Sequence, residues 1–259
     1  MKPLRLITSL VLIMLLSPLT LFAGTVENLL RQGDQLLGAF NNSAALRKYE
    51  EALRISPDHF EALLRLSRTN MDIADVIRAK QGNDAPDAEK YYSTALSYAE
   101  RMLEKYPDRA ESYFFMSAAT GNMALYKGGK EKVKIGRDVE MYAKKAIEIN
   151  PSYALSYCVL GIFYREVAHL NWFLKAFANT FFGGLPSGTN EDSERLLRKA
   201  IALDPSLMIA YYELGKTCEV MDREDEARTM YIKASKLPAL SEYDRIRSSK
   251  ASMHVKRLQ

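Results

Sequence analysis

Apolar and small residues recur at fixed distances after four prolines of the chain. Positions six and nine after each proline are apolar or aromatic, and position ten is small. The prolines are Pro57, Pro107, Pro151 and Pro205, and the small residues are Ser67, Ser117, Gly161 and Gly215. This spacing places the residues on one face of a helix, where a small residue lets a second helix cross closely. Another apolar segment precedes each proline, and the proline ends that helix because it has no backbone N–H to donate.

This pattern resembles the tetratricopeptide repeat, a helix–turn–helix unit of about 34 residues. The last unit fits well, because Pro205 and Pro238 are 33 residues apart, and Gly33 occupies the small position of the first unit. We therefore predict an all-α fold, a tetratricopeptide-like helical solenoid of about five helix pairs with lengthened middle helices. The predicted repeat domain spans residues 24–240, with units at about 26–57, 60–107, 110–151, 154–205 and 208–238.

Three insertions separate the helices of the middle units. Successive prolines are 50, 44 and 54 residues apart, and these spacings exceed the repeat by about 16, 10 and 20 residues. Turn-forming residues lie in each insertion, at 83–87, 127–132 and 183–188. We expect longer helices whose hairpin ends protrude from one edge of the solenoid. Residues 241–259 are predicted to form a basic C-terminal capping helix that begins at Ser241 and seals the stack.

The first 23 residues have the pattern of a secretory signal peptide. Lys2 and Arg5 precede an apolar run, Pro18 interrupts it, and Ala23 is the small residue at a plausible cleavage point. We therefore expect an exported protein, periplasmic or otherwise extracytoplasmic, with no integral membrane span once residues 1–23 are removed. The alternative is an N-terminal membrane anchor, because residues 6–24 are just long enough to cross a bilayer.

Charge and composition argue against nucleic-acid binding and against catalysis. The chain has a formal net charge of +4, of which Lys2 and Arg5 supply two units, and the remainder lacks the concentrated basic face that nucleic acid requires. His59, His169 and His254 lie far apart, and no catalytic or metal-binding motif is present in the sequence. We predict a non-enzymatic protein that uses no cofactor or metal.

Two cysteines lie in the first helices of neighbouring predicted units. Cys158 is seven residues after its proline, whereas Cys218 is thirteen residues after its own. Different repeat positions point the side chains in different directions, which disfavours a disulfide. We expect two buried thiols.

Residues 161–258 contain runs that are more specific than the generic repeat. They are Gly161-Ile-Phe-Tyr164, Leu170-Asn-Trp-Phe-Leu-Lys175, Phe181-Phe-Gly-Gly-Leu-Pro-Ser187 and Lys199-Ala-Ile-Ala-Leu-Asp-Pro205. In these runs the chain resembles the regulator of microtubule dynamics family, whose bacterial relatives are mostly uncharacterised exported proteins. The resemblance implies a helical interaction module without catalytic residues, and microtubule binding is not carried over to a chain expected to be exported. A weaker resemblance is to exported tetratricopeptide partners of solute-binding transport systems, some of which form oligomers with an apolar channel.

The first helix of each unit is expected to line a concave groove. Positions four, seven, eleven and fourteen after each proline should face it. The candidate groove residues are Leu64, Arg68, Met71, Phe114, Leu155, Ile162, Arg165, Ile209, Tyr212 and Lys216. Their mixed, rather apolar character predicts a protein-interaction scaffold that binds a protein partner of unknown identity. The alternatives are a carrier or transport-accessory protein that binds a small apolar ligand, and a groove covered by the long helices or the third insertion.

The third insertion is rich in aromatic residues. They are Trp172, Phe173, Phe177, Phe181 and Phe182. The simpler interpretation is that they pack back on the stack as additional core. The alternative is a surface for a partner or for a second copy of the chain, because a large exposed apolar patch marks an interaction site. The basic segment 127–137 is expected to be a soluble hairpin end, with anionic lipid or a partner protein as the lesser alternative.

Overall fold

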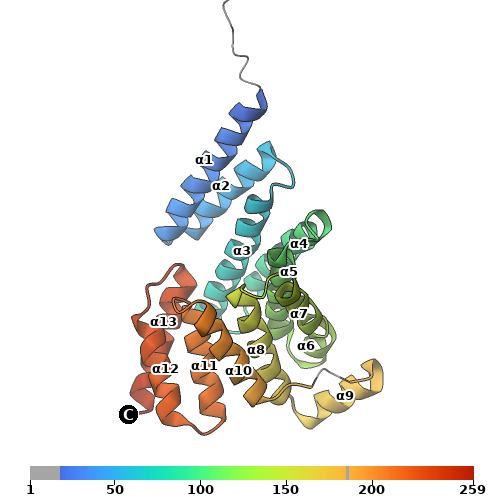
Figure 1. Ribbon diagram of the computed structural model, residues 1–259, viewed down its shortest axis with the longest axis vertical. Coiled ribbons are helices and arrows are strands. Elements are labelled where there is room, and N and C mark those ends of the chain that lie inside the picture. Colours follow the sequence, from blue (N-terminus) through green and yellow to red (C-terminus); the bar gives the residue numbers. More distant parts are fainter. Residues whose placement is uncertain (1–17, 185–186) are drawn as a thin grey trace, which may run out of the picture.

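The computed structural model describes residues 18–184 and 187–259, and this part of the chain contains thirteen helices and no strand (Figure 1). The predicted all-α solenoid is confirmed. Residues 1–17 of the predicted signal peptide lie outside the described residues. The helices are α1 (Pro18–Gly38), α2 (Asn42–Ile55), α3 (Phe60–Gln81), α4 (Pro86–Lys105), α5 (Ala110–Lys127), α6 (Gly129–Gly136), α7 (Val139–Ile149), α8 (Ala154–Ala168), α9 (Trp172–Phe182), α10 (Asn190–Leu203), α11 (Met208–Val220), α12 (Glu224–Lys236) and α13 (Glu242–Arg257).

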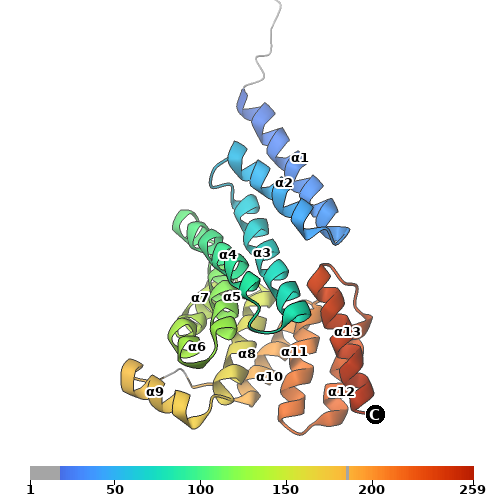
Figure 2. The same cartoon turned by 180° about the vertical axis from the view of Figure 1, so that it is seen from behind.

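Ten of these helices form five packed pairs. The pairs are α1 with α2, α3 with α4, α5 with α7, α8 with α10, and α11 with α12. Successive pairs stack on one another, and Figure 2 shows the resulting superhelix from behind. The first helices of the last four pairs, α3, α5, α8 and α11, therefore lie next to one another along the inner side.

Small residues allow the two helices of each pair to approach closely. A Cβ added at Gly161 would lie 3.0 Å from Leu197 Cγ, and one at Gly215 would lie 2.7 Å from Cε1 of Tyr231. At the equivalent position of the second unit, the Ser67 hydroxyl donates a 2.9 Å hydrogen bond to the Ala95 carbonyl of the facing helix. The repeat position that is small in the sequence is thus the point of closest helix contact.

The three insertions take different forms. The first extends α3 and α4 to 22 and 20 residues, as predicted, and the second lengthens α5 to 18 residues but then forms the separate helix α6. The third leaves α8 and α10 at 15 and 14 residues and forms α9 between them, so the expectation of a longer hairpin is wrong there. Glycines with positive φ, including Gly128 and Gly183, end the preceding helices, and a backbone in this region is accessible mainly to glycine.

Helix α13 caps the last pair and also turns back toward α3. Ser241 accepts a 3.1 Å hydrogen bond from the Asp244 backbone N–H, which confirms the predicted N-cap. The ring of His254 stacks on Tyr231 of α12, with centroids 4.5 Å apart. At the other end of α13, Glu242 forms a 2.6 Å ion pair with Lys80 of α3. The cap therefore closes the curve of the solenoid as well as its end.

No helix within residues 18–184 and 187–259 combines the length and the hydropathy that a membrane span requires.

Candidate functional site

The inner side of the solenoid encloses a cavity of about 570 Å³. Nine of the ten predicted groove residues line it, and helices α3, α5, α8 and α11 contribute them. These residues are Leu64, Arg68, Met71, Phe114, Leu155, Ile162, Arg165, Ile209 and Lys216. A repeat register read from the prolines thus identifies side chains that converge on one cavity, here called the groove.

Tyr212 is the predicted groove residue that lies elsewhere. Its ring packs beside Tyr231, with centroids 5.7 Å apart, and beside His254 at 6.1 Å. Position seven faces the groove in the earlier units, as Phe114 does. In the last unit, α13 packs on α11 and covers this position. The prediction for Tyr212 is therefore wrong because the cap, rather than open groove, lies next to the last unit.

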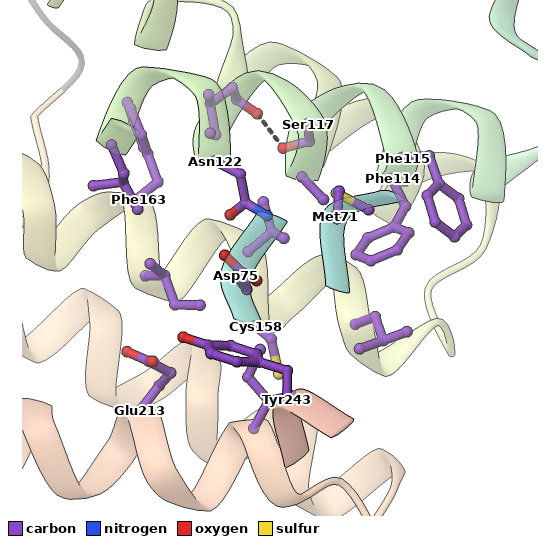
Figure 3. A pocket seen from close by; sticks show the side chains of 18 of the residues that line it. Met71, Asp75, Phe114, Phe115, Ser117, Asn122, Cys158, Phe163, Glu213 and Tyr243 are labelled. Carbon is purple, nitrogen blue, oxygen red and sulfur yellow. Dashed lines mark hydrogen bonds between the residues drawn. The ribbon is translucent and has the colours of Figure 1, made fainter. Parts of the chain in front are cut away.

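One wall of the groove is apolar. Phe114 and Phe115 come from α5 and Phe163 comes from α8, and each is less than 10% exposed. Figure 3 shows Phe114 beside Met71 with Phe115 next to it, Phe163 at the opposite end of the view, and Asp75 between them. A wall of buried apolar side chains provides area for an apolar ligand or for a partner's side chains.

A buried ion pair lies at the α8–α11 side of the groove. Arg165 is 3% exposed, pairs with the Glu213 carboxylate at 2.5 Å and donates to the Glu213 carbonyl at 3.0 Å. Lys216 lies 3.0 Å from the same carboxylate. Burial opposes ionisation of Glu213, but the charges and hydrogen bonds of Lys216 and Arg165 lower its pKa to about 2. The ion pair fixes α8 against α11. The Arg165 guanidinium already has hydrogen-bond partners within the protein and needs no ligand to supply them.

A second polar cluster lies where α13 approaches α3. Burial raises the pKa of Asp75 to about 6, against the opposing effects of a hydrogen bond from Tyr92 and the charge of Arg247. Burial also raises the pKa of Asp72, whose carboxylate accepts a 2.6 Å hydrogen bond from Asn42. Asp75 and Tyr243 both reach into the pocket in Figure 3.

Sequence reasoning did not predict the groove residues of α13. Tyr243, Asp244 and Arg247 line the groove together with Leu240. They lie outside the repeats, so the repeat register could not place them. One signal in the sequence was available: Tyr243 lies between charged residues of an otherwise polar helix. An aromatic residue in such a helix indicates that this position packs against another part of the protein.

Arg68 is one of the cations that line the groove. It is exposed and forms no ion pair among the described residues, whereas Arg165, Lys216 and Arg247 each lie within 3.0 Å of a carboxylate. Arg78 of the groove also lacks an ion pair but donates hydrogen bonds to the Asn83 carbonyl and the Tyr92 hydroxyl, whereas no such partner is seen for Arg68 among the described residues. A partner's carboxylate could therefore pair with Arg68 without breaking an existing ion pair.

The aromatic residues of the third insertion are largely exposed. Trp172 is 80% exposed, Phe181 67% and Phe173 49%, whereas Phe177 and Phe182 are partly buried. The expectation that this segment packs back as core is wrong for the first three. No residue of α9 lines the groove, so the third insertion does not cover it. The reason is that α9 packs mainly on α6, at the periphery of the stack (Figure 1).

The remaining candidate groups show no catalytic arrangement within the described residues. Cys158 and Cys218 are free and buried, as expected, and burial raises both thiol pKa values. His169 contacts Asn190, and His254 of α13 lies 3.1 Å from Glu219 of α11. No group of three or more His, Cys, Asp or Glu side chains within residues 18–184 and 187–259 is arranged to hold a metal ion.

Most of this chain is similar in sequence to proteins of one known family. The profile of the family described as regulator of microtubule dynamics protein 1-3 matches residues 29–259. The chain belongs to the regulator of microtubule dynamics family. Regulator of microtubule dynamics protein 1 of Mus musculus is 27% identical over 226 residues, which cover 85% of this chain and 70% of that protein. Protein 3 of Mus musculus is 27% identical over 222 residues, which cover 83% of this chain and 42% of that protein.

A solved structure supports the fold independently. A thermophilic tetratricopeptide repeat protein of Thermus thermophilus superposes with a TM-score of 0.62 and 23% identity, covering 88% of this chain and 99% of that one. The likeness concerns the fold alone. The match to the regulator of microtubule dynamics family runs from α1 to the end of the chain and therefore includes both α9 and α13, the two elements that depart from the repeat.

Proposed function

We propose that this member of the regulator of microtubule dynamics family is a non-catalytic interaction scaffold that binds a segment of a protein partner in its groove. The observation that carries the proposal is the convergence of nine repeat-encoded side chains on one cavity. Apolar rings from α5 and α8 line the groove, as does Arg68, which is exposed and forms no ion pair among the described residues. This combination suits an amphipathic segment that buries apolar side chains and carries an acidic residue.

Site-specific crosslinking tests this proposal. A photoreactive residue would replace Leu64 or Ile162, both partly buried in the groove, and the matched control would replace Met141, which is 54% exposed on α7. In intact cells we expect one protein adduct shared by the two groove positions and absent from the control position. Folded protein without any groove-specific adduct would contradict the proposal. Substitution of Arg68 by Glu should reduce the adduct, because it places like charge opposite an acidic segment.

The second candidate is a carrier that holds a small apolar ligand. The observation in its favour is the volume of about 570 Å³, which lies within the range of about 300–1,000 Å³ typical of small-molecule sites. Native mass spectrometry of the purified protein would then detect a retained molecule. Ile162→Trp should displace it by filling the cavity, whereas Met141→Trp should leave it bound. A ligand-free spectrum for protein isolated without detergent or organic solvent would count against the carrier.

We further propose that the protein acts outside the cytoplasm, as the pattern of residues 1–23 suggests. The support is the order of Lys2 and Arg5, an apolar run and Ala23. Intact-mass measurement of protein from an envelope fraction would test it. A mature chain that begins at Gly24 is the expected result, whereas a full-length chain in the membrane fraction would favour an N-terminal anchor.

A further inference from the structure

Helix α9 is a defined element that stands apart from the stack. Its N-terminus is capped by Asn171, whose side chain accepts a 2.9 Å hydrogen bond from the Leu174 backbone N–H. Gly183 ends it in the left-handed region, with φ of 72°. Among its residues, Ala178 is fully buried, and Leu174 and Phe177 pack around it toward Val133 of α6. Helix α6 thus covers the buried side of α9.

Aromatic rings at both ends of α9 are exposed to solvent, and the Phe181 ring also contacts Phe177 of the α6-facing side, with centroids 4.9 Å apart. Trp172, Phe173 and Phe181 are the exposed aromatic side chains, and the rings of Trp172 and Phe173 contact each other edge-on at 6.1 Å. Among the described residues, few other large apolar side chains are as exposed, and none of them is aromatic. Exposed apolar surface that is gathered on one projecting helix indicates a surface that another body covers.

Cations surround these rings. Lys130 of α6 lies 5.3 Å from the centroid of Phe173 and 5.0 Å from that of Phe177, and the Arg137 guanidinium lies 4.6 Å above Phe182. Lys175 projects from α9 itself and is exposed. Lys130, Arg137 and Lys175 form no ion pair among the described residues. They are therefore available to an anionic surface.

Acidic residues are scarce on the same surface. The sequence holds no Asp or Glu between Glu166 and Glu191. On the α6 side, Glu131 is paired with Lys134 at 3.4 Å, Glu166 is paired with Lys132 at 2.5 Å, and Asp138 is exposed. The surface formed by α6 and α9, here called the α6–α9 surface, therefore combines exposed Trp and Phe rings with an excess of positive charge.

We propose that the α6–α9 surface docks peripherally on an anionic membrane. Trp and Phe side chains partition into the headgroup region, where an interfacial helix buries its apolar face by about 5–10 Å, and Lys and Arg side chains pair with anionic headgroups. A protein partner or a second copy would need acidic residues opposite the cations, whereas a bilayer supplies negative charge and an apolar layer together. The inference is independent of what the groove holds.

The chain contains one tryptophan, Trp172, so its fluorescence reports on α9 alone. The full-length protein would be mixed with vesicles of phosphatidylcholine alone and with vesicles of phosphatidylcholine and phosphatidylglycerol. On the anionic vesicles we expect a blue shift of the emission and quenching by brominated acyl chains, both reversed by high salt. An apolar segment within residues 1–23 that inserted by itself would leave the tryptophan signal unchanged.

Matched variants distinguish binding through the α6–α9 surface from non-specific attraction by the net charge of the protein. Lys130→Ala combined with Arg137→Ala should weaken binding to anionic vesicles by roughly 25-fold, because each cation near the surface contributes about fivefold. Lys90→Ala combined with Lys256→Ala removes the same charge from exposed sites on α4 and α13 and should leave binding within about twofold. Phe181→Ala, which keeps the reporter, should reduce the blue shift, with circular dichroism confirming the fold.

Two results would overturn the inference. One is unchanged emission on anionic vesicles. The other is a blue shift that appears with rising protein concentration in the absence of lipid, together with a doubled mass, which would identify the α6–α9 surface as a contact between two copies.

Discussion

Replacing Gly215 by alanine tests whether the close contact between paired helices holds the fold together. The added Cβ would lie 2.7 Å from Cε1 and 2.9 Å from Cδ1 and Cζ of Tyr231. Carbon atoms in contact are separated by about 3.5–4.0 Å, so the ring would have to move by roughly 1 Å. Tyr231 is fully buried between Tyr212 and His254, and it has little room to move.

The expected destabilisation follows from two opposing effects. Overpacking of a filled core costs about 1–3 kcal/mol. Replacing glycine by alanine in a helix interior stabilises the folded state by up to about 1 kcal/mol, because glycine loses more backbone entropy on folding. The net expectation for Gly215→Ala is a loss of about 1–2 kcal/mol, which lowers the melting temperature by roughly 2–8 °C in a chain of this size.

Gly121→Ala is the matched control. Gly121 also lies inside a helix, but an added Cβ would meet only the Val139 methyl groups at 3.9 and 4.0 Å, which is ordinary contact. This variant should be stabilised by up to about 1 kcal/mol. Urea and thermal unfolding followed by circular dichroism would compare the two variants. The reasoning is refuted if Gly215→Ala melts at or above the wild-type temperature, or if Gly121→Ala is the less stable of the two.

Three further predictions concern buried polar groups. Arg165→Met leaves the Glu213 carboxylate buried with only Lys216 as a partner, and it should cost about 3 kcal/mol in urea unfolding at pH 7. Asp75→Asn should stabilise the protein by up to about 3 kcal/mol at pH 8 and change it little at pH 4. The sign follows because the folded pKa of about 6 exceeds the ordinary value of 3.8, so the wild type loses stability as pH rises from about 4 to 6; equal effects at both pH values would contradict it. Cys158 and Cys218 should react with a thiol reagent only after unfolding, and two thiols should then titrate without reductant; fewer than two would reveal a disulfide.

The sequence predicts the repeat and its inner face well because both depend on local spacing. Gly161 and Gly215 occupy the small position ten residues after a proline, and the structure places both against a bulky side chain of the partner helix. Groove residues follow from the same count, since neighbouring first helices present equivalent positions to the same side. Side-chain direction in a helix is fixed by residue number, so this part of the site could be assigned without coordinates.

The features that the sequence does not predict depend on curvature and on the surroundings of a segment. Tyr243 reaches the groove only because the superhelix curves enough to bring α13 against α3, and small rotations between repeats set that curvature. Trp172 and Phe173 could equally be core or surface, since an aromatic segment has the same composition in either place. Their exposure depends on how far α9 stands from the stack, which no local pattern specifies.

Helix α13 determines which of the two proposed occupants the groove can accept. The cavity of about 570 Å³ has the size of a small-molecule site, and Tyr243, Asp244 and Arg247 of α13 line it. We therefore expect a small molecule to fit beside α13, and a longer partner helix to displace the N-terminal half of α13. Two exposed contacts help to hold that half, the Glu242–Lys80 ion pair and Arg245 over the Phe40 ring at 4.9 Å, and the buried Ser241 adds a hydrogen bond to Asp72.

Glu242→Ala combined with Arg245→Ala should therefore open the groove at small cost. Each contact contributes on the order of 0.5 kcal/mol, so the displaced state should gain roughly fivefold in population. If the occupant is a protein segment, crosslinking from Ile162 should increase by a similar factor, while Lys145→Ala with Glu148→Ala, which removes an exposed ion pair on α7, should have no effect. Unchanged crosslinking together with weaker retention of a small molecule would refute displacement of α13 and favour the carrier, because a half-enclosed cavity loses affinity for a small ligand when its cover is loosened.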